Sequence, residues 1–262
     1  MENNKKPVVI SIINLKGGVG KTTTAVNVAA ALRELGKRSL LVDLDSQGSA
    51  TRSLHRGSVE YTVGDLMFGQ SGLEETLISS QVGIDLLPSN IELADYERSL
   101  TTLKNYHTYL AKVFKQVSGE YDFILIDCPP SLGNLTVNAL YASDYYLVPV
   151  LTDFYSLDGI KNITTTAHKV QQLNPELNLL GVLVTRYNVN DKKIVDRQVF
   201  EKLQSVLGEL LFETTIRVNN PLKDAVINTQ DIFTFDSKSN GAQDYAALTQ
   251  EILNRVGAVK VS

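Results

Sequence analysis

The chain has 262 residues, which is enough for one α/β domain to bury a full core. Its hydrophobic content of 43% and charged content of 21% are ordinary for a globular protein, so composition alone names no function. The formal net charge of −4 excludes nucleic-acid binding through overall charge, and any such contact must come from a local basic patch.

The sequence also restricts the location of the protein. The first residues lack the apolar stretch of a secretory signal, and no apolar run approaches the roughly 18 residues that a membrane span needs. The single cysteine, Cys128, cannot form an internal disulfide and fits a reducing compartment. We therefore expect a cytoplasmic protein.

Short runs of β-branched and aliphatic residues alternate with helix-length segments along the chain. The runs that predict strands are 8–13, 39–42, 84–87, 123–126, 145–150 and 179–185. The segments that predict helices are 22–35, 105–117, 132–142, 157–173, 193–207 and 243–256. This alternation is typical of a doubly wound α/β fold with a mostly parallel sheet, helices on both faces, and ligands at the carboxyl ends of the strands. We expect residues 1–262 to form a single domain, without a helix-turn-helix module ahead of Val8.

The last predicted helix has one apolar face, on which residues recur every three or four positions: Tyr245, Leu248, Ile252 and Val256. This spacing favours packing against the sheet. A helix that binds a membrane surface would need a cluster of basic residues, which this tail lacks, so we expect no membrane partner.

A glycine-rich turn follows the first predicted strand and leads into the first predicted helix. It reads Lys16-Gly17-Gly18-Val19-Gly20-Lys21-Thr22-Thr23. Glycines allow positive φ angles that direct several backbone N–H groups inward, which makes a cradle for phosphate oxygens at a helix N-terminus. We expect all eight residues to bind a nucleotide, with Lys21 at the β- and γ-phosphates and the Thr22 hydroxyl as a ligand of Mg²⁺. Lys16 stands before the glycines and is better placed for the phosphates of a facing subunit.

Acidic residues follow two of the predicted strands. Asp127 comes after the run 123–126, which places its carboxylate near the phosphates, where it suits a Mg²⁺ ion held through water. Asp43 and Asp45 follow the run 39–42 two residues apart, so one carboxylate faces the core edge and the other the nucleotide. Strand-end aspartates also cap the turns or helices that follow them, and for Asp43 both interpretations remain open.

Three segments resemble the sequence boxes of the ParA/MinD group of P-loop ATPases, in that family's order and spacing. Residues 16–23 resemble its deviant Walker A box, with the signature lysine at Lys16. Residues 41–51 resemble its switch I box, with Ser46 where the family usually has proline, and residues 123–131 resemble its Walker B and switch II box. The likeness covers nearly the whole chain. It implies a P-loop NTPase fold, with ATP and Mg²⁺ bound and ATP hydrolysed.

The resemblance also implies roles for individual residues. Asp45 matches the switch I aspartate that positions the attacking water, and with Thr22 and Asp127 it completes the residues expected around Mg²⁺. Lys21 would hold the γ-phosphate, and Lys16 of a partner subunit would act much like an arginine finger. The residues expected to carry hydrolysis are therefore Lys16, Lys21 and Asp45.

Residues 213–225 align without gaps to a family stretch whose proline and asparagine line the adenine pocket. The corresponding residues are Arg217, which departs from the family, and Asn219, which matches it. Val218 and Pro221 stand where relatives commonly have arginines that help bind non-specific DNA. Other cations can form such a patch, and the candidates are Arg186, Lys192, Lys193, Arg197, Lys223 and Lys238. The alternative is a solvated helix face of mixed charge.

The sequence thus predicts a ParA-type ATPase that switches between a monomer and an ATP-dependent sandwich homodimer. The dimer would bind double-stranded DNA non-specifically and associate with the nucleoid. A ParB-like or cargo-adaptor protein would stimulate hydrolysis to position a chromosome, plasmid or other cargo. The alternatives are a nucleotide-dependent interaction scaffold with negligible hydrolysis and a MinD-like regulator at a membrane.

Overall fold

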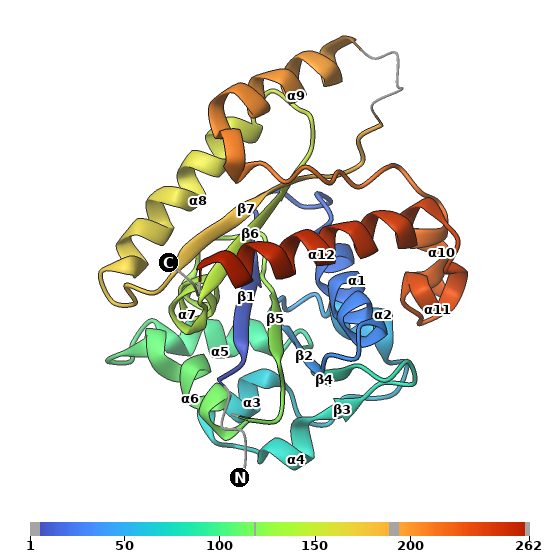
Figure 1. The fold of residues 1–262 in the computed structure, drawn as a ribbon. Coiled ribbons are helices and arrows are strands. Elements are labelled where there is room, and N and C mark those ends of the chain that lie inside the picture. The colour runs from blue at the N-terminus through green and yellow to red at the C-terminus, as the bar shows by residue number, and fades with distance from the viewer. Residues whose placement is uncertain (1–5, 118, 189–193, 260–262) are drawn as a thin grey trace.

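The computed structural model describes residues 6–117, 119–188 and 194–259. A seven-stranded sheet forms its centre, in the order β3-β4-β2-β5-β1-β6-β7 (Figure 1). Neighbouring strands are parallel except β3, which runs antiparallel to β4 at one edge. The strands are β1 (Val8–Ile12), β2 (Ser39–Asp43), β3 (Ile78–Ser79), β4 (Asp85–Leu87), β5 (Phe123–Asp127), β6 (Tyr145–Val150) and β7 (Asn178–Val184). The predicted doubly wound, mostly parallel α/β fold is confirmed.

Helices cover both faces of the sheet (Figure 1). One face carries α1 (Lys21–Glu34), α2 (Ser49–Leu54), α10 (Pro221–Ile227), α11 (Ile232–Asp236) and α12 (Asn240–Val259). The other carries α3 (Val63–Phe68), α4 (Leu73–Thr76), α5 (Leu93–Leu100), α6 (Tyr109–Gln116), α7 (Asn134–Ala142), α8 (Ser156–Gln171) and α9 (Ile194–Leu207). Two 3₁₀ turns span Tyr106–Thr108 and Gly208–Leu210.

The alternation of side chains along β1 shows how the sheet separates two cores. Val8, Ile10 and Ile12 pack into the core beneath α1 and α12, whereas Val9 packs into the core on the opposite face. Every residue of β1 is buried. A continuous apolar run of this kind is typical of a parallel strand covered on both faces.

Most predicted elements are present, with differences at their ends. The helix expected at 105–117 begins as a 3₁₀ turn, because Asn105 has a φ of 55° and interrupts regular helix. The last helix is longer than expected, and its four predicted apolar residues are buried. Lys193, the expected first residue of another helix, lies outside the described residues. No helix within the described ranges is long and apolar enough to cross a membrane.

The parallel strands bring distant segments of the chain to one edge of the sheet. Asp127 at the end of β5 lies between Ile12 of β1 and Asp43 of β2 in the strand register. The glycine-rich turn after β1 and the acidic segment after β2 therefore flank the end of β5. The candidate site occupies this edge.

Candidate functional site

The glycine-rich loop has the backbone geometry of an anion cradle. Gly18 and Gly20 have φ angles of 75° and 93°, in the left-handed region that favours glycine. The first amide groups of α1 have no intrahelical acceptor, as in any helix, and Gly20, which precedes α1, has no side chain to cap them. Free amides at a helix N-terminus, together with the helix dipole, favour a negatively charged ligand.

Asp127 lies beside this loop and is 1% exposed. Its Oδ2 accepts a hydrogen bond from the Thr22 hydroxyl at 2.7 Å, and its Oδ1 is buried without a hydrogen-bond partner among the described residues. Burial, and after it the charge of Asp43, raises the pKa of Asp127 well above its usual value. A buried, unpaired acceptor is costly, so this carboxyl suits a cation or a water that supplies the missing partner.

Lys21, the first residue of α1, is also buried, with 7% of its surface exposed. Its amine donates to the carbonyl of Lys16 at 3.3 Å, so it is held within the loop. Burial lowers the pKa of Lys21, although the charge of Asp127 opposes this shift. Nearby phosphate oxygens would favour the charged amine.

The two aspartates after β2 have different environments. Asp43 is fully buried, and its Oδ2 accepts hydrogen bonds from the backbone N–H and the hydroxyl of Thr51, both at 2.8 Å. Burial raises the pKa of Asp43 to about 6, although the bonds from Thr51 act in the opposite direction. Asp45 lines a cavity instead, and its Oδ1 accepts a hydrogen bond from the N–H of Gln47 at 2.9 Å. The expected division between a core-facing and a cavity-facing carboxylate is present in the structure.

This cavity has a volume of about 750 Å³ and two kinds of wall. Its polar wall includes six of the eight predicted loop residues: Gly17, Gly18, Gly20, Lys21, Thr22 and Thr23. Its apolar wall is formed by Val26, Ile216, Val218, Leu222, Val226 and Ile227. A site with a phosphate cradle beside an apolar wall fits a nucleotide, which has a charged end and a flat base.

Arg217 and Asn219 both line this cavity, but only one has a side chain without a partner. The Arg217 guanidinium is paired with Asp244, with Nη2 donating to Oδ1 at 2.6 Å. The Oδ1 of Asn219 is buried and has no hydrogen-bond partner among the described residues. Asn219 is therefore the better candidate for a polar contact with a base, and Arg217 is held in the wall.

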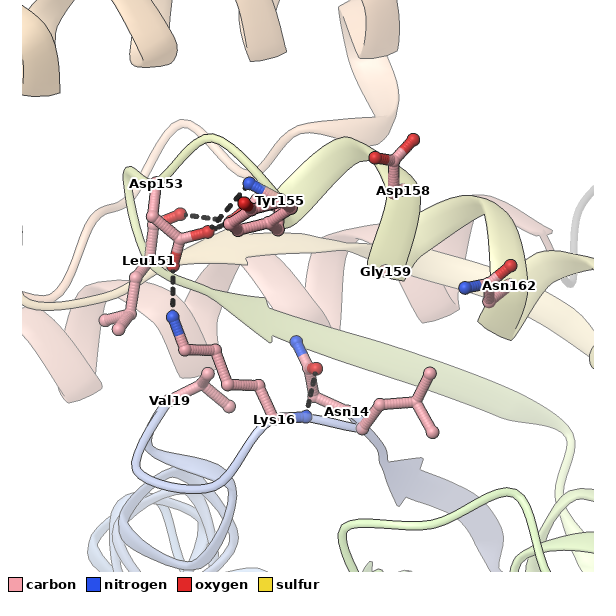
Figure 2. A pocket seen from close by; sticks show the side chains of 11 residues that line it. Asn14, Lys16, Val19, Leu151, Asp153, Tyr155, Asp158, Gly159 and Asn162 are labelled. Atoms are coloured by element: carbon pink, nitrogen blue, oxygen red, sulfur yellow. Dashed lines mark hydrogen bonds and ion pairs between the residues drawn. The ribbon is translucent and has the colours of Figure 1, made fainter.

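Lys16 and Val19, the other two loop residues, line a second cavity of about 280 Å³ between the loop and the start of α8 (Figure 2). The Lys16 amine points across this cavity to Asp153 and forms an ion pair at 2.7 Å. The Lys16 side chain is 53% exposed and that of Asp153 is 28% exposed. Within one chain, Lys16 is thus turned towards the loop after β6.

Similar sequences and structures identify the family. A family described as an AAA domain matches residues 7–179. The sporulation initiation inhibitor protein Soj of Bacillus subtilis is 38% identical over 248 residues, which cover 93% of this chain and 97% of Soj. The chain belongs to the ParA/MinD family of P-loop ATPases. Chromosome partitioning protein ParA of Myxococcus xanthus is 35% identical over 251 residues, covering 94% of this chain and 88% of that protein.

A solved structure has the same fold as this ParA/MinD family member. It is a cobyrinic acid a,c-diamide synthase from Mycobacterium smegmatis with a bound ATP analog and magnesium. The two chains are 33% identical with a TM-score of 0.82, and the match covers 96% of each.

The four cations predicted to bind DNA that the structure describes have different surroundings in this ParA/MinD chain. Arg186 and Lys223 line the larger cavity, whereas Arg197 is paired with Glu201 on α9 at 3.0 Å. Lys238 is exposed after α11. Lys192 and Lys193 lie outside the described residues. Arg217, next to the position where relatives commonly have an arginine, is paired with Asp244.

The residues at the site that were not predicted from the sequence include the apolar wall and the polar residues Asp153, Thr185 and Arg52. Asp153 pairs with Lys16, and the Thr185 hydroxyl donates to the carbonyl of Val19 at 2.7 Å. Arg52, on α2, lines the larger cavity. Asp153 and Thr185 follow strands β6 and β7, so their position at strand ends was the available signal.

Proposed function

We propose that this protein is an ATP-hydrolysing switch of the ParA type, which dimerises around ATP, binds DNA non-specifically and responds to a partner protein. The observation that carries the proposal is the hydrogen bond from Thr22 to the buried Asp127 beside a glycine cradle, with Oδ1 of Asp127 unpaired among the described residues. Phosphate release from ATP, compared with a Lys21→Ala control, tests it. A rate no higher than the control would refute hydrolysis.

The residues present fit a magnesium–ATP complex. Thr22 would bind Mg²⁺ directly and Asp127 through water, since Mg²⁺ usually retains several waters beside one or two protein oxygens and the phosphates. Magnesium would supply positive charge to the β- and γ-phosphates. Lys21 would add its own charge, and Asp45 would orient the water that attacks the γ-phosphate.

We assign the base to the apolar wall of the larger cavity. The unpaired Oδ1 of Asn219 is a hydrogen-bond acceptor and suits the amino group of adenine. Guanine presents a carbonyl at the equivalent position, which would leave two acceptors facing each other. The predicted preference is therefore for ATP over GTP, measurable by competition against a fluorescent ATP analogue.

The role of Lys16 lies between subunits. Its ion pair with Asp153 must break before the amine can reach phosphates across a two-fold interface, where their charge would hold it. Lys16→Ala should retain nucleotide binding but lose ATP-dependent dimerisation. Light scattering that shows an unchanged dimer would contradict this role.

DNA binding, association with the nucleoid and stimulation by a ParB-like or cargo-adaptor protein complete the proposed cycle. Soj and ParA, by their names, act in sporulation control and chromosome partitioning, which supports this cycle by similarity. Exposed cations such as Arg186 and Lys238 would contact phosphates weakly and in a salt-dependent way. A gel shift with duplex DNA, repeated with ATP, ADP and no nucleotide at two salt concentrations, tests this part.

A further inference from the structure

The segment between β2 and α2 holds Asp45 at the larger cavity through a tight turn. The N–H of Gly48 donates to the carbonyl of Asp45 at 2.8 Å, and the Ser89 hydroxyl donates to the same carbonyl at 2.9 Å. Gly48 has a φ of 61°, and a Cβ there would lie 2.9 Å from the carbonyl oxygen of Ser89. This turn therefore requires glycine and fixes the backbone of Asp45.

The carboxylate of Asp45 is oriented by a separate chain of contacts. Its Oδ1 accepts the N–H of Gln47 at 2.9 Å, and the carbonyl of Gln47 accepts a hydrogen bond from Nη1 of Arg52. The Oδ2 of Asp45 accepts no hydrogen bond from the described part of the chain. Arg52 thus holds the backbone of Gln47, Gln47 holds one carboxylate oxygen, and the second oxygen is left for a water.

The electrostatic position of Arg52 differs from that of the arginines held in ion pairs, and Arg186, which also lines the cavity, shares this feature within the described residues. Arg33 and Arg217 are each paired with an aspartate. Arg52 is exposed at the cavity and forms no ion pair within the described residues. A guanidinium has five N–H donors, so its contact with Gln47 leaves donors and a full charge at the cavity wall.

We propose that Arg52 is a positioning residue for ATP hydrolysis. It holds Gln47 so that the carboxylate of Asp45 stays aligned with the attacking water. The inference rests on the proposed function. It adds Arg52, a cation of the same subunit, to the residues that the sequence predicts to carry hydrolysis. Its effect falls on turnover, because the cradle and the apolar wall that bind the nucleotide do not depend on it.

The test compares Arg52→Ala, Arg52→Lys and the wild type for phosphate release at saturating ATP and Mg²⁺, and for the affinity of a fluorescent ATP analogue. Displacement of a reacting group by about 1 Å costs up to about 100-fold in rate, so we expect Arg52→Ala to lower kcat about tenfold. The dissociation constant should change less than about threefold. Arg52→Lys keeps the charge and can still donate to the carbonyl of Gln47, so it should recover part of the rate.

Arg98→Ala is the matched control, because Arg98 is an exposed arginine on α5 that is paired only with Asp95 among the described residues. It should keep the wild-type rate. The proposal is overturned if kcat of Arg52→Ala stays within twofold of wild type, if affinity falls in proportion to rate, or if light scattering shows an equal loss of the ATP-dependent dimer. A wild-type rate no higher than that of Lys21→Ala refutes the proposed function itself, and the positioning role falls with it.

Discussion

Replacing Asp153 by asparagine would test whether the ion pair with Lys16 opposes dimerisation. Asparagine keeps the Oδ1 acceptor, which receives the N–H of Tyr155 at 3.1 Å and the hydroxyl of Ser156 at 3.1 Å at the start of α8. It removes the acceptor for Lys16 at 2.7 Å. Partial burial acts to raise the pKa of Asp153, but hydrogen bonds from Lys16 and Ser156 hold it below its usual value, so this carboxyl is ionised at neutral pH.

The expected magnitude follows from the exposure of the pair. Lys16 is about half exposed, and ion pairs of this kind contribute about 0.2 to 1 kcal/mol. Each dimer breaks two such pairs, so Asp153→Asn should favour dimerisation by about 0.4 to 2 kcal/mol, or about 2- to 30-fold in the dissociation constant. Analytical ultracentrifugation with a non-hydrolysable ATP analogue measures this constant without interference from turnover.

Asp158→Asn is the matched control for this experiment. Asp158 lines the same cavity in the first turn of α8, and in the described part of the chain it makes no ion pair with Lys16. It should leave the dissociation constant nearly unchanged. High salt should reduce the effect of Asp153→Asn, because the pair is partly exposed. Equal shifts in both variants, or weaker dimerisation of Asp153→Asn, would refute the reasoning.

Three further predictions concern the acidic residues and DNA. Asp45→Ala should retain ATP, slow phosphate release about 100-fold and prolong the dimer, and normal turnover would contradict its role. Because burial raises the pKa of Asp43 to about 6, the native state holds a proton that the unfolded chain releases near pH 4, so the free energy of unfolding should fall by up to about 3 kcal/mol as the pH rises from about 4 to 6. Asp43→Asn should reduce this slope in urea titrations, although the raised pKa of Asp127 contributes a slope of the same sign. An unchanged slope would mean that Asp43 does not cause it. Lys238→Ala should lower the dependence of log K for duplex DNA on log salt by about one unit, and an unchanged dependence would remove Lys238 from the patch.

The parts of the site that the sequence predicted are local. The glycine loop, the strand that precedes it and the helix that follows it are contiguous, and Asp127 directly extends an apolar run. Their geometry follows from the order of strand, turn and helix. The sequence therefore located the cradle and its acidic neighbour without knowledge of the tertiary contacts.

The parts that the sequence did not predict depend on distant pairings. Asp153 lies 137 positions from Lys16, and nothing in the local pattern indicates that the two meet. Arg217 lines the larger cavity, and the sequence does not indicate that its guanidinium pairs with Asp244, which lies 27 positions further along. Arg52 lies on helix α2, which has only six residues. Such a short helix shows no helical periodicity in the sequence, so the position of Arg52 at the cavity could not be predicted.

The position of β1 between β5 and β6 has a consequence for synthesis on the ribosome. β1 ends at Ile12, but its neighbours begin at Phe123 and Tyr145, so the emerging segment waits for more than a hundred residues before it can pair. At about 5 to 20 residues per second, that wait is on the order of 5 to 20 s. An all-apolar segment without pairing partners for so long is prone to aggregation, so chaperones are expected to matter most in this interval.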